Sequence, residues 1–404
     1  MRSTSRSHAV VIVGAGPAGL AVSSRLLRLG LPHVVVERDE VASTWRTQRW
    51  DSFRLNTPLW AARVPAKGLR GRSGSFPSPA SLVSGLERLA RRLPVAEGVE
   101  VFAARRSGPG WKLHTNRGAL PADAVVVASG FQNVPRVPAF ASALPERIQQ
   151  LHVAGYRRPQ QVGDAVLVVG GGQSGVQIVE DLLDAGKRVY LATSRVGRIP
   201  RRFAGRDAFE WMLDTGQLDV AREDVDRVVI GTATPQVSGV GGGRTVSYQA
   251  LAARGATLLG RAVGWNHGRL ELAGDLGENV HFADDVSDFF RATWDKRARL
   301  RGARPELDPD DEPAPHLYGD TGPASLDLVR DGIGSVIWAT GFGPSTGWLP
   351  SGALDSRRRP QLPGLHVIGA PWLTHRSSAN LYGMAADADR VVDALTRQPL
   401  RIAA

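Results

Sequence analysis

Two glycine-rich segments carry the residue types and spacing that bind dinucleotides, and the first lies near the start of the chain. Gly14, Gly16 and Gly19 follow the apolar run at residues 9–13 in a G-x-G-x-x-G pattern. In such a pattern the first glycine makes a tight turn and the second lets backbone N–H groups approach a pyrophosphate. The third lets the following helix pack on the strand. The segment therefore predicts a phosphate-binding turn.

A βαβ unit is expected around this first turn. Residues 9–13 are typical of a buried parallel strand, residues 20–29 predict a helix that ends at Gly30, and residues 33–36 predict the next strand. Glu37 closes that strand, where a carboxylate can accept a hydrogen bond from a ribose hydroxyl. A glycine-rich turn in another kind of α/β protein is the alternative, but the strand, helix, second strand and acid together favour a dinucleotide site.

The second segment repeats this arrangement with a different ending. Gly170, Gly172 and Gly175 follow the apolar run at residues 165–169, and a helix to residue 183 and a strand at 188–192 are expected after them. Glu37 lies 18 residues after the third glycine of the first segment. The residue at the same distance from Gly175 is Thr193, and Ser194 and Arg195 follow it.

A carboxylate at that offset would repel a 2′-phosphate, whereas a hydroxyl and a guanidinium favour one. The second site is therefore expected to prefer NADPH to NADH, with Arg195 as the principal phosphate contact. Arg198, Arg201 and Arg202 follow closely and either add to this positive field or form a solvated basic loop.

Two dinucleotide folds in one chain predict a bound flavin and a nicotinamide that delivers hydride to it. The chain has no Cys, which excludes disulfide-reductase chemistry, cysteine nucleophiles and thiolate metal sites. None of the nine His residues stands in a recognisable hydrolase pattern or at metal-ligand spacing, so no metal is expected. A flavin that passes electrons to oxygen or to a small acceptor is the chemistry that remains.

Composition limits the partners. A chain of 404 residues suits two or three domains, and 42% hydrophobic with 22% charged residues is an ordinary globular composition. The net charge of +11 comes almost entirely from Arg, with acidic residues interspersed, so no nucleic-acid partner is expected. Since no run of about 18 apolar residues occurs, no membrane partner is expected either. We expect a cytoplasmic protein with a small-molecule substrate, and a homodimer is compatible with the sequence.

Segments along nearly the whole chain resemble the flavin-containing monooxygenases in their bacterial branch, relatives of the plant auxin-forming and Baeyer–Villiger monooxygenases. Thr44-Trp45-Arg46 and the segment from Trp50 to Pro58 resemble the part of the family that covers the flavin. The strand that begins at Val336 resembles the family's return to the flavin domain. The segments with this resemblance are residues 44–46, 50–58, 127–131, 151–159, 197–211, 336–342, 364–372 and 377–383.

The resemblance implies an α/β fold with two Rossmann-like dinucleotide-binding domains. The FAD-binding domain would be discontinuous, at residues 1–155 and 326–404, with the NADPH-binding domain at 156–325 inserted in it. Residues 304–315, rich in Pro and Asp, are expected to form a surface loop or hinge. The implied cofactors are FAD and NADPH, with O2 as co-substrate, and the implied oxidant is a flavin C4a-(hydro)peroxide.

Site residues follow from the motifs and from the resemblance. Asn56 is the candidate near the reaction, because the family's corresponding segment approaches flavin and NADP; a plain turn at Asn56-Thr57-Pro58 is the alternative. The C-terminal helix expected over residues 381–395 would aim its N-terminal dipole at the flavin. The candidate cofactor-binding residues are Gly14, Gly16, Pro17, Ala18, Gly19, Glu37, Arg38, Trp45, Arg46, Ser129, Gly130, Gly170, Gly172, Gln173, Ser174, Gly175, Ser194, Arg195, Thr340, Gly341, Asn380 and Leu381.

The chain departs from the family pattern at several positions. Ser129 stands where the family has Thr, and Gln173 where it usually has Asn. Glu146 and Ile148 stand in place of the linker fingerprint that marks Baeyer–Villiger enzymes. This loss favours oxygenation at nitrogen or sulfur. Baeyer–Villiger oxygenation of a ketone, an NADPH-dependent flavin reductase or oxidase, and a redox-sensing binding module stay open as alternatives.

Overall fold

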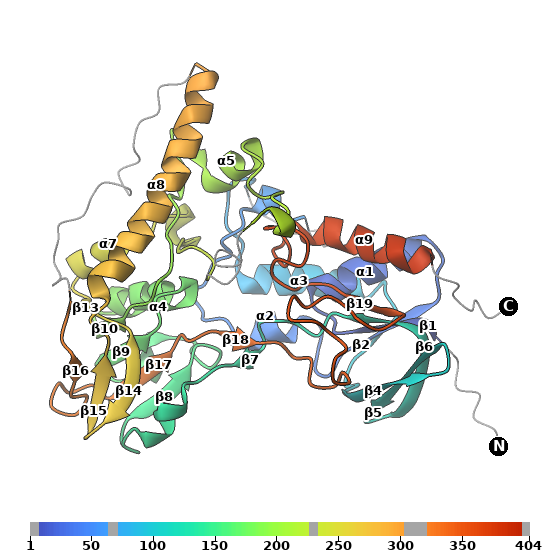
Figure 1. Ribbon diagram of the computed structural model, residues 1–404, viewed down its shortest axis with the longest axis horizontal. Coiled ribbons are helices and arrows are strands. Elements are labelled where there is room, and N and C mark those ends of the chain that lie inside the picture. The colour runs from blue at the N-terminus through green and yellow to red at the C-terminus, as the bar shows by residue number, and fades with distance from the viewer. Residues whose placement is uncertain (1–7, 64–71, 226–232, 303–320, 398–404) are drawn as a thin grey trace.

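A computed structural model of the chain describes residues 8–63, 72–225, 233–302 and 321–397. Two sheets lie side by side, each with helices packed against it (Figure 1). The expected loop at 304–315 lies outside the described residues.

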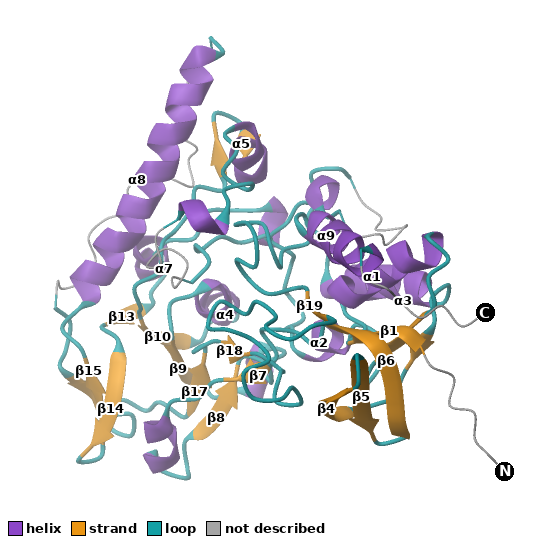
Figure 2. Cartoon of the chain, turned by 45° about the vertical axis from the view of Figure 1, so that its right-hand side comes forward, coloured by secondary structure: helices purple, strands orange, loops and turns teal. Residues whose placement is uncertain are grey.

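The first sheet has seven strands in the order β3-β2-β1-β6-β5-β4, with β19 paired to β6. β1 is flanked in parallel by β2 and β6, whereas β4 and β5 form an antiparallel edge. Figure 2 shows α1, α3 and α9 together beside β1 and β6. The strands are β1 His8–Val13, β2 His33–Val36, β3 Val95–Ala96, β4 Val101–Ser107, β5 Gly110–Thr115, β6 Gly118–Val127 and β19 Leu365–Val367; the helices are α1 Pro17–Arg28, α3 Pro79–Ala90 and α9 Met384–Thr396.

The second sheet is entirely parallel, with five strands in the order β13-β10-β9-β17-β8. Its central strand β9 is buried at every residue, as expected for a parallel strand covered on both faces. The strands are β8 Gln149–His152, β9 Ala165–Val169, β10 Arg188–Ala192, β13 Thr257–Leu259 and β17 Ser335–Trp338, and the helices α4 Gln173–Asp184 and α7 Tyr248–Ala253 contact each other beside them.

Two segments cross between the sheets, and they pair with each other on the way. β7 (Val134–Pro135) leaves the first unit and β18 (Phe342–Gly343) returns to it, and the two form an antiparallel pair. Figure 1 shows this pair between the two sheets. His152, at the end of β8, supports the return because its Nε2–H donates to the carbonyl of Gly341 over 3.0 Å.

Sheet membership corrects the predicted domain boundaries. The strand that includes Val336 does not return to the flavin domain: β17 lies between β9 and β8 in the second sheet. β8 also belongs to that sheet, although residues 149–152 were expected in the first domain. An apolar strand run shows that a strand will be buried but not which sheet will accept it, and here the return to the first unit follows β17.

A third part of the fold extends from the second unit. The long helix α8 (Leu276–Leu300) projects beyond the sheet and packs on α5 (Ala208–Asp214) through stacked Trp211 and Trp294, whose ring centroids are 6.4 Å apart. The remaining elements are α2 Ser43–Thr47, the antiparallel pair β11 Arg202–Phe203 and β12 Arg206–Asp207, and the small sheet β14 Ala262–Asn266, β15 Arg269–Leu272 and β16 Ser325–Leu326.

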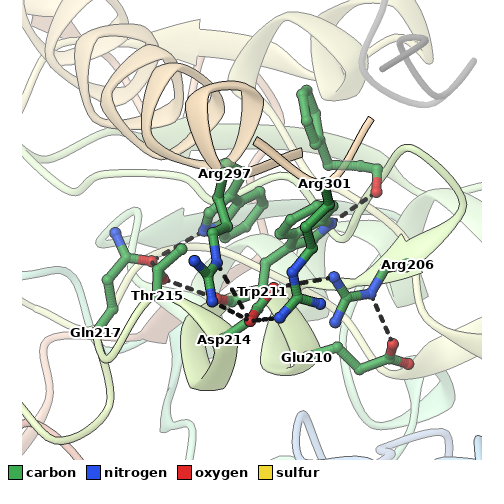
Figure 3. A network of polar contacts seen from close by, with 10 residues as sticks. Arg206, Glu210, Trp211, Asp214, Thr215, Gln217, Arg297 and Arg301 are labelled. Atoms are coloured by element: carbon green, nitrogen blue, oxygen red, sulfur yellow. Dashed lines mark hydrogen bonds and ion pairs between the residues drawn. The ribbon is translucent and has the colours of Figure 1, made fainter. Parts of the chain in front are cut away.

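One carboxylate joins α5 to α8. Figure 3 shows Asp214 among the guanidinium groups of Arg206, Arg297 and Arg301. The Asp214 side chain is only 9% exposed. Burial by itself raises the pKa of this carboxyl, but hydrogen bonds from Arg297 and Arg206 outweigh it and hold the pKa below its ordinary value.

None of the helices in the described part of the chain is long and apolar enough to span a bilayer.

We expect Asp214→Asn to lower the free energy of unfolding by about 1–3 kcal/mol, because a nearly isosteric amide loses the charge that three arginines share. Thermal unfolding followed by circular dichroism measures the change. Since the folded pKa is lowered, the wild-type advantage should be present at neutral pH and disappear as the pH falls below about 4.

The matched control is Asp295→Asn, which removes the exposed i,i+4 pair of Asp295 with Arg299 on the same α8 helix. This pair should contribute no more than about 0.5 kcal/mol to the free energy of unfolding. Equal losses in the two variants would show that the Asp214 cluster is no more than another surface ion pair.

Candidate functional site: a cavity between two glycine turns

One cavity of about 1110 Å³ lies between the two units and is lined by both glycine turns. It contacts most of the residues that the sequence singles out. Its lining includes Gly14, Gly16, Pro17, Ala18, Glu37, Arg38, Trp45, Asn56, Ser129, Gly130, Gly170, Gly172, Gln173, Ser174, Ser194, Thr340, Gly341, Asn380 and Leu381. Gly19, Gly175, Arg46 and Arg195 are not part of the lining.

The three glycines of the first turn differ in what surrounds them, as their three predicted roles require. Gly14 has φ +111°, and a Cβ there would lie 2.4 Å from the carbonyl oxygen of Ala128. A Cβ on Gly19 would lie 2.0 Å from the carbonyl oxygen of Gly14, so this glycine serves helix packing rather than the cavity. A Cβ on Gly16 would meet no atom within 4 Å. Gly16 is therefore the position that leaves open space for a ligand.

Glu37 lies at the carboxyl end of β2, next to this turn. Its Oε2 accepts from the backbone N–H of Ala15 over 2.7 Å, and its Oε1 accepts from that of Asp39 over 3.0 Å. Two backbone donors fix the carboxylate at the edge of the cavity, while each oxygen keeps a lone pair for a further donor. The contact of Glu37 to a ribose hydroxyl stays a prediction.

The second glycine turn has the same construction. Gly170 has φ +111°, and a Cβ there would lie 2.6 Å from the carbonyl oxygen of Ala339. A Cβ on Gly175 would lie 1.9 Å from the carbonyl oxygen of Gly170, whereas one on Gly172 would meet nothing within 4 Å. The two turns thus present two equivalent open cradles to one cavity.

A buried tyrosine that the sequence did not point to holds the second turn. The hydroxyl of Tyr248, on α7, donates to the carbonyl of Ser194 over 2.8 Å and occupies the space that a Cβ on Gly171 would need. Burial raises the pKa of Tyr248 to about 12. The phenol therefore stays neutral and acts as a fixed donor. Ser194 completes the arrangement, because its Oγ accepts from the N–H of Gly171 over 2.9 Å.

Asn56 connects the first unit to helix α4 of the second. Its Nδ2 donates to Oε1 of Gln173 over 3.0 Å, and its Oδ1 accepts from Nε2 of Gln177 over 3.1 Å. The backbone carbonyl of Asn56 also accepts from Nη1 of Arg201 over 2.9 Å. Asn56 is more than a turn residue, since both ends of its amide are used. Gln177 was missed by sequence reasoning because it carries no motif.

The arginines after β10 do not act together. The exposed Arg195 places its guanidinium 4.5 Å from the ring centroid of Phe282, outside the cavity lining. Arg198 pairs with Asp284, and the buried Arg201 pairs with Asp207. Arg202 donates to the carbonyls of residues 242 and 243. Structural partners therefore hold these last three side chains, and their contribution to a phosphate field stays a prediction.

Helix α2 corrects the role expected of Arg46. This candidate cofactor-binding side chain is not part of the cavity lining; it forms ion pairs with Glu40 and with Glu87, and the second of these joins α2 to α3. Trp45 on the same helix does line the cavity, as expected.

The remaining candidates lie on the crossing segments and before α9. The hydroxyl of Ser129 donates to the carbonyl of Ser345, and that of Thr340 to the carbonyl of Arg136. Asn380 accepts with Oδ1 from the N–H of Tyr382 and Gly383, so it closes a turn and α9 begins at Met384, three residues later than expected.

His152 organises the linker rather than the chemistry. Burial lowers its pKa, although the hydrogen bond to Gly341 opposes this shift. Its Nδ1 accepts from the N–H of Ala154 over 3.2 Å, which leaves Nε2 as the protonated nitrogen. Within the described ranges no group of three or more His, Asp or Glu side chains is arranged to hold a metal ion.

Comparison with known proteins places this arrangement in a family context. The model of the pyridine nucleotide-disulphide oxidoreductase family matches residues 11–201. A CzcO-like uncharacterised oxidoreductase of Geobacillus kaustophilus is 26% identical over 401 residues, covering 95% of this chain and 97% of the relative. The indole-3-pyruvate monooxygenase YUCCA1 of Oryza sativa is 34% identical over 207 residues, about half of each chain.

Solved structures agree on the fold over nearly the whole chain. A variant of the flavin monooxygenase from Stenotrophomonas maltophilia has a TM-score of 0.65 at 18% identity, covering 97% of this chain and 98% of its own. The ornithine N-hydroxylase of Kutzneria sp. 744 has a TM-score of 0.62 at 16% identity, with 97% and 99% covered. The α/β fold with two dinucleotide-binding domains is thereby confirmed.

The glycine geometry predicts a sharp difference between neighbouring alanine variants. Gly16→Ala places its methyl in open space, so the protein should fold normally but retain about tenfold less flavin, because the methyl intrudes where a pyrophosphate must approach. The flavin-to-protein absorbance ratio after gel filtration measures this loss.

Two controls accompany it. Gly172→Ala makes the same change in the second turn and should leave flavin content unchanged. Gly19→Ala meets the carbonyl of Gly14 and should lower the melting temperature by itself. Normal flavin content in the Gly16 variant would overturn the assignment of the first turn.

Proposed function

We propose that the chain is a class B flavin monooxygenase, which binds FAD and NADPH in one cavity and uses them with O2 to oxygenate a small organic substrate. The chain is a flavin-dependent oxidoreductase. One observation carries the proposal: two glycine cradles of the same construction, each with open space at its second glycine, face the same cavity.

The residues present fit these two cofactors. In the first turn, Gly16 would admit the FAD pyrophosphate to the N-terminal end of α1, and Glu37 would accept from the ribose. In the second, Gly172 would admit the NADPH pyrophosphate to the N-terminal end of α4. Ser194 and Arg195 stand where a carboxylate would disfavour the 2′-phosphate, which supports NADPH over NADH.

Bound FAD would supply the redox chemistry, accepting hydride from NADPH and passing electrons to O2. The protein's part is to orient and to exclude water. Aromatic side chains of Trp45, Trp50 and Phe53 line the cavity beside the crossing segments. They give it a partly apolar wall, and such a wall limits the access of water to the oxidant.

We assign Asn56 the position closest to the reaction. It lines the cavity between the two glycine turns, and Gln173 and Gln177 fix both ends of its amide. A side chain held in this way is pre-organised to hydrogen-bond a cofactor bound on either side.

We propose nitrogen or sulfur as the oxygenated atom. Support comes from the sequence, where Glu146 and Ile148 replace the linker fingerprint of Baeyer–Villiger enzymes. A deprotonated oxidant attacks ketones and a protonated one attacks amines and thioethers, so the product distinguishes the two reactions.

The function is tested by reducing the FAD-loaded protein with NADPH without oxygen, admitting O2, and identifying products from matched amines, thioethers and ketones. We expect N-oxides or sulfoxides formed with consumption of NADPH. Products from ketones alone would replace the proposal with Baeyer–Villiger oxygenation. Complete conversion of NADPH equivalents to H2O2 across the panel would make the protein a reductase or oxidase.

Arg195→Ala should raise KM for NADPH by about tenfold and leave KM for NADH unchanged, because only NADPH carries the 2′-phosphate. Steady-state kinetics with both nucleotides measure this. Arg188→Ala is the control, since Arg188 begins β10 at the end opposite to the cavity and its guanidinium donates to the carbonyl of Asp331. Equal effects of Arg195→Ala on the two nucleotides would refute the phosphate contact.

A further inference from the structure

A second arginine near the site is placed in a way that its structural surroundings do not explain. Arg49 lies just after α2 and lines the cavity between the two units. Its guanidinium stacks on two cavity-lining rings, 4.6 Å from the centroid of Trp45 and 5.6 Å from that of Phe53. The two rings thus hold the guanidinium against an aromatic part of the wall.

The charge of Arg49 lacks a carboxylate partner. Within the described ranges no Asp or Glu forms an ion pair with it, and its one hydrogen bond runs from Nη1 to the carbonyl of Gln48 over 2.8 Å. Burial, together with the nearby charge of Arg157, lowers the pKa of Arg49 to about 10, yet the group stays charged at neutral pH. A partly buried cation beside another cation is stabilised when an anion joins it.

Other arginines around the site have carboxylates as partners or neighbours. Arg46, three residues earlier, forms ion pairs with Glu40 and Glu87. The buried Arg201 forms an ion pair with Asp207. Arg157, next to Arg49, donates from Nη1 to backbone carbonyls; burial lowers its pKa, and the nearby carboxylate of Asp51 opposes this shift. Arg49 therefore stands out as a fixed cation that faces the cavity with Nε and Nη2 still able to donate.

Arg49 is separated from the first glycine turn by the length of helix α2. Helix α2 begins beside the first glycine turn, where the N–H of Ala42 donates to the carbonyl of Ala15, and Arg49 follows the far end of that helix. The lining of the same cavity includes Trp50, which follows Arg49 in the chain, and also Val153 and Phe342. The cavity that Arg49 lines therefore has apolar and aromatic side chains in its wall as well as the two glycine turns.

We propose that Arg49 is the anion-binding group of the substrate site and that the substrate carries a carboxylate on an aromatic or other apolar body. This inference rests on the proposed function, because it assigns the substrate class of the same cavity. A planar guanidinium can bind a carboxylate through two parallel N–H···O bonds, and the flanking rings suit an apolar body. The carboxylate of the substrate would form an ion pair with Arg49 and would orient the rest of the substrate in the cavity.

The test measures binding and does not depend on turnover. Isothermal titration calorimetry of the FAD-loaded protein, without NADPH, compares benzoate, phenylacetate and 3-phenylpropanoate with their uncharged amides. We expect at least one acid to bind about tenfold more tightly than its amide. Arg49→Gln should abolish this preference, and Arg49→Lys should keep part of it, since a point charge replaces a fork.

Arg54→Gln is the matched control, because it removes one positive charge from the same segment at a residue outside the cavity lining. It should keep the preference for acids. Flavin content, melting temperature and NADP⁺ binding are measured for all variants to establish that each is folded and loaded.

Three results would overturn the inference: no preference for any acid in the wild type, an unchanged preference in Arg49→Gln, or a selective loss of flavin or NADP⁺ binding in that variant. The last result would assign the guanidinium to a cofactor phosphate. Failure of the proposed function is distinguishable, since a protein that binds acids through Arg49 but forms no oxygenated product keeps this inference and loses the other.

Discussion

The close approach of two peptide carbonyls to two glycines is the constraint on which the rest of the structure depends. The carbonyl of Ala128 lies so near Gly14, and that of Ala339 so near Gly170, that a single Cβ at either glycine would overlap it. Ala128 directly follows β6 and Ala339 directly follows β17. The chain thus leaves each sheet at the carboxyl end of a strand that lies beside a glycine turn, and it then continues toward the other sheet.

This placement explains why one cavity serves two cradles. Because both crossing segments start at the glycine turns, the antiparallel pair β7–β18 lies between the turns, and the cavity lining comes from both units. Polar contacts then set how the units meet: His152 binds the carbonyl of Gly341, and Asn56 binds Gln173 and Gln177 of α4. Transfer of hydride between two bound dinucleotides requires such fixed proximity.

Local patterns predicted the parts of this arrangement that local physics determines. The runs at 33–36, 165–169 and 188–192 became β2, β9 and β10 with the same bounds, because short apolar runs between glycines or charges fit buried parallel strands. Helix α1 began earlier than predicted, at Pro17, because proline is well tolerated in the first turn of a helix.

Long-range partners were not predictable in this way. Nothing near Val336 shows that β17 pairs with β8 and β9, and nothing near Tyr248 shows that its hydroxyl fills the space beside Gly171. Arg46 was expected at the flavin because of its neighbours in sequence, but helix geometry directs it to Glu40 and Glu87 instead. A charge in a motif shows what chemistry is available, and only the fold shows which acid it meets.

That distinction bears on the strong positive charge of the chain. Arginines that hold elements together, such as Arg198 and Arg201, are neutralised by Asp284 and Asp207, so they contribute little net field in the cavity. The cations that the cavity does present are Arg38, Arg49 and Arg261, of which Arg38 pairs with Asp39 and Arg261 with Asp275. Arg49 is then the cavity cation whose field is least compensated within the described residues, and it lies where the two units meet. Under the proposed function, the phosphates of two dinucleotides would benefit from a positive potential in the cavity, and the guanidinium of Arg49 would extend that benefit to a third anion.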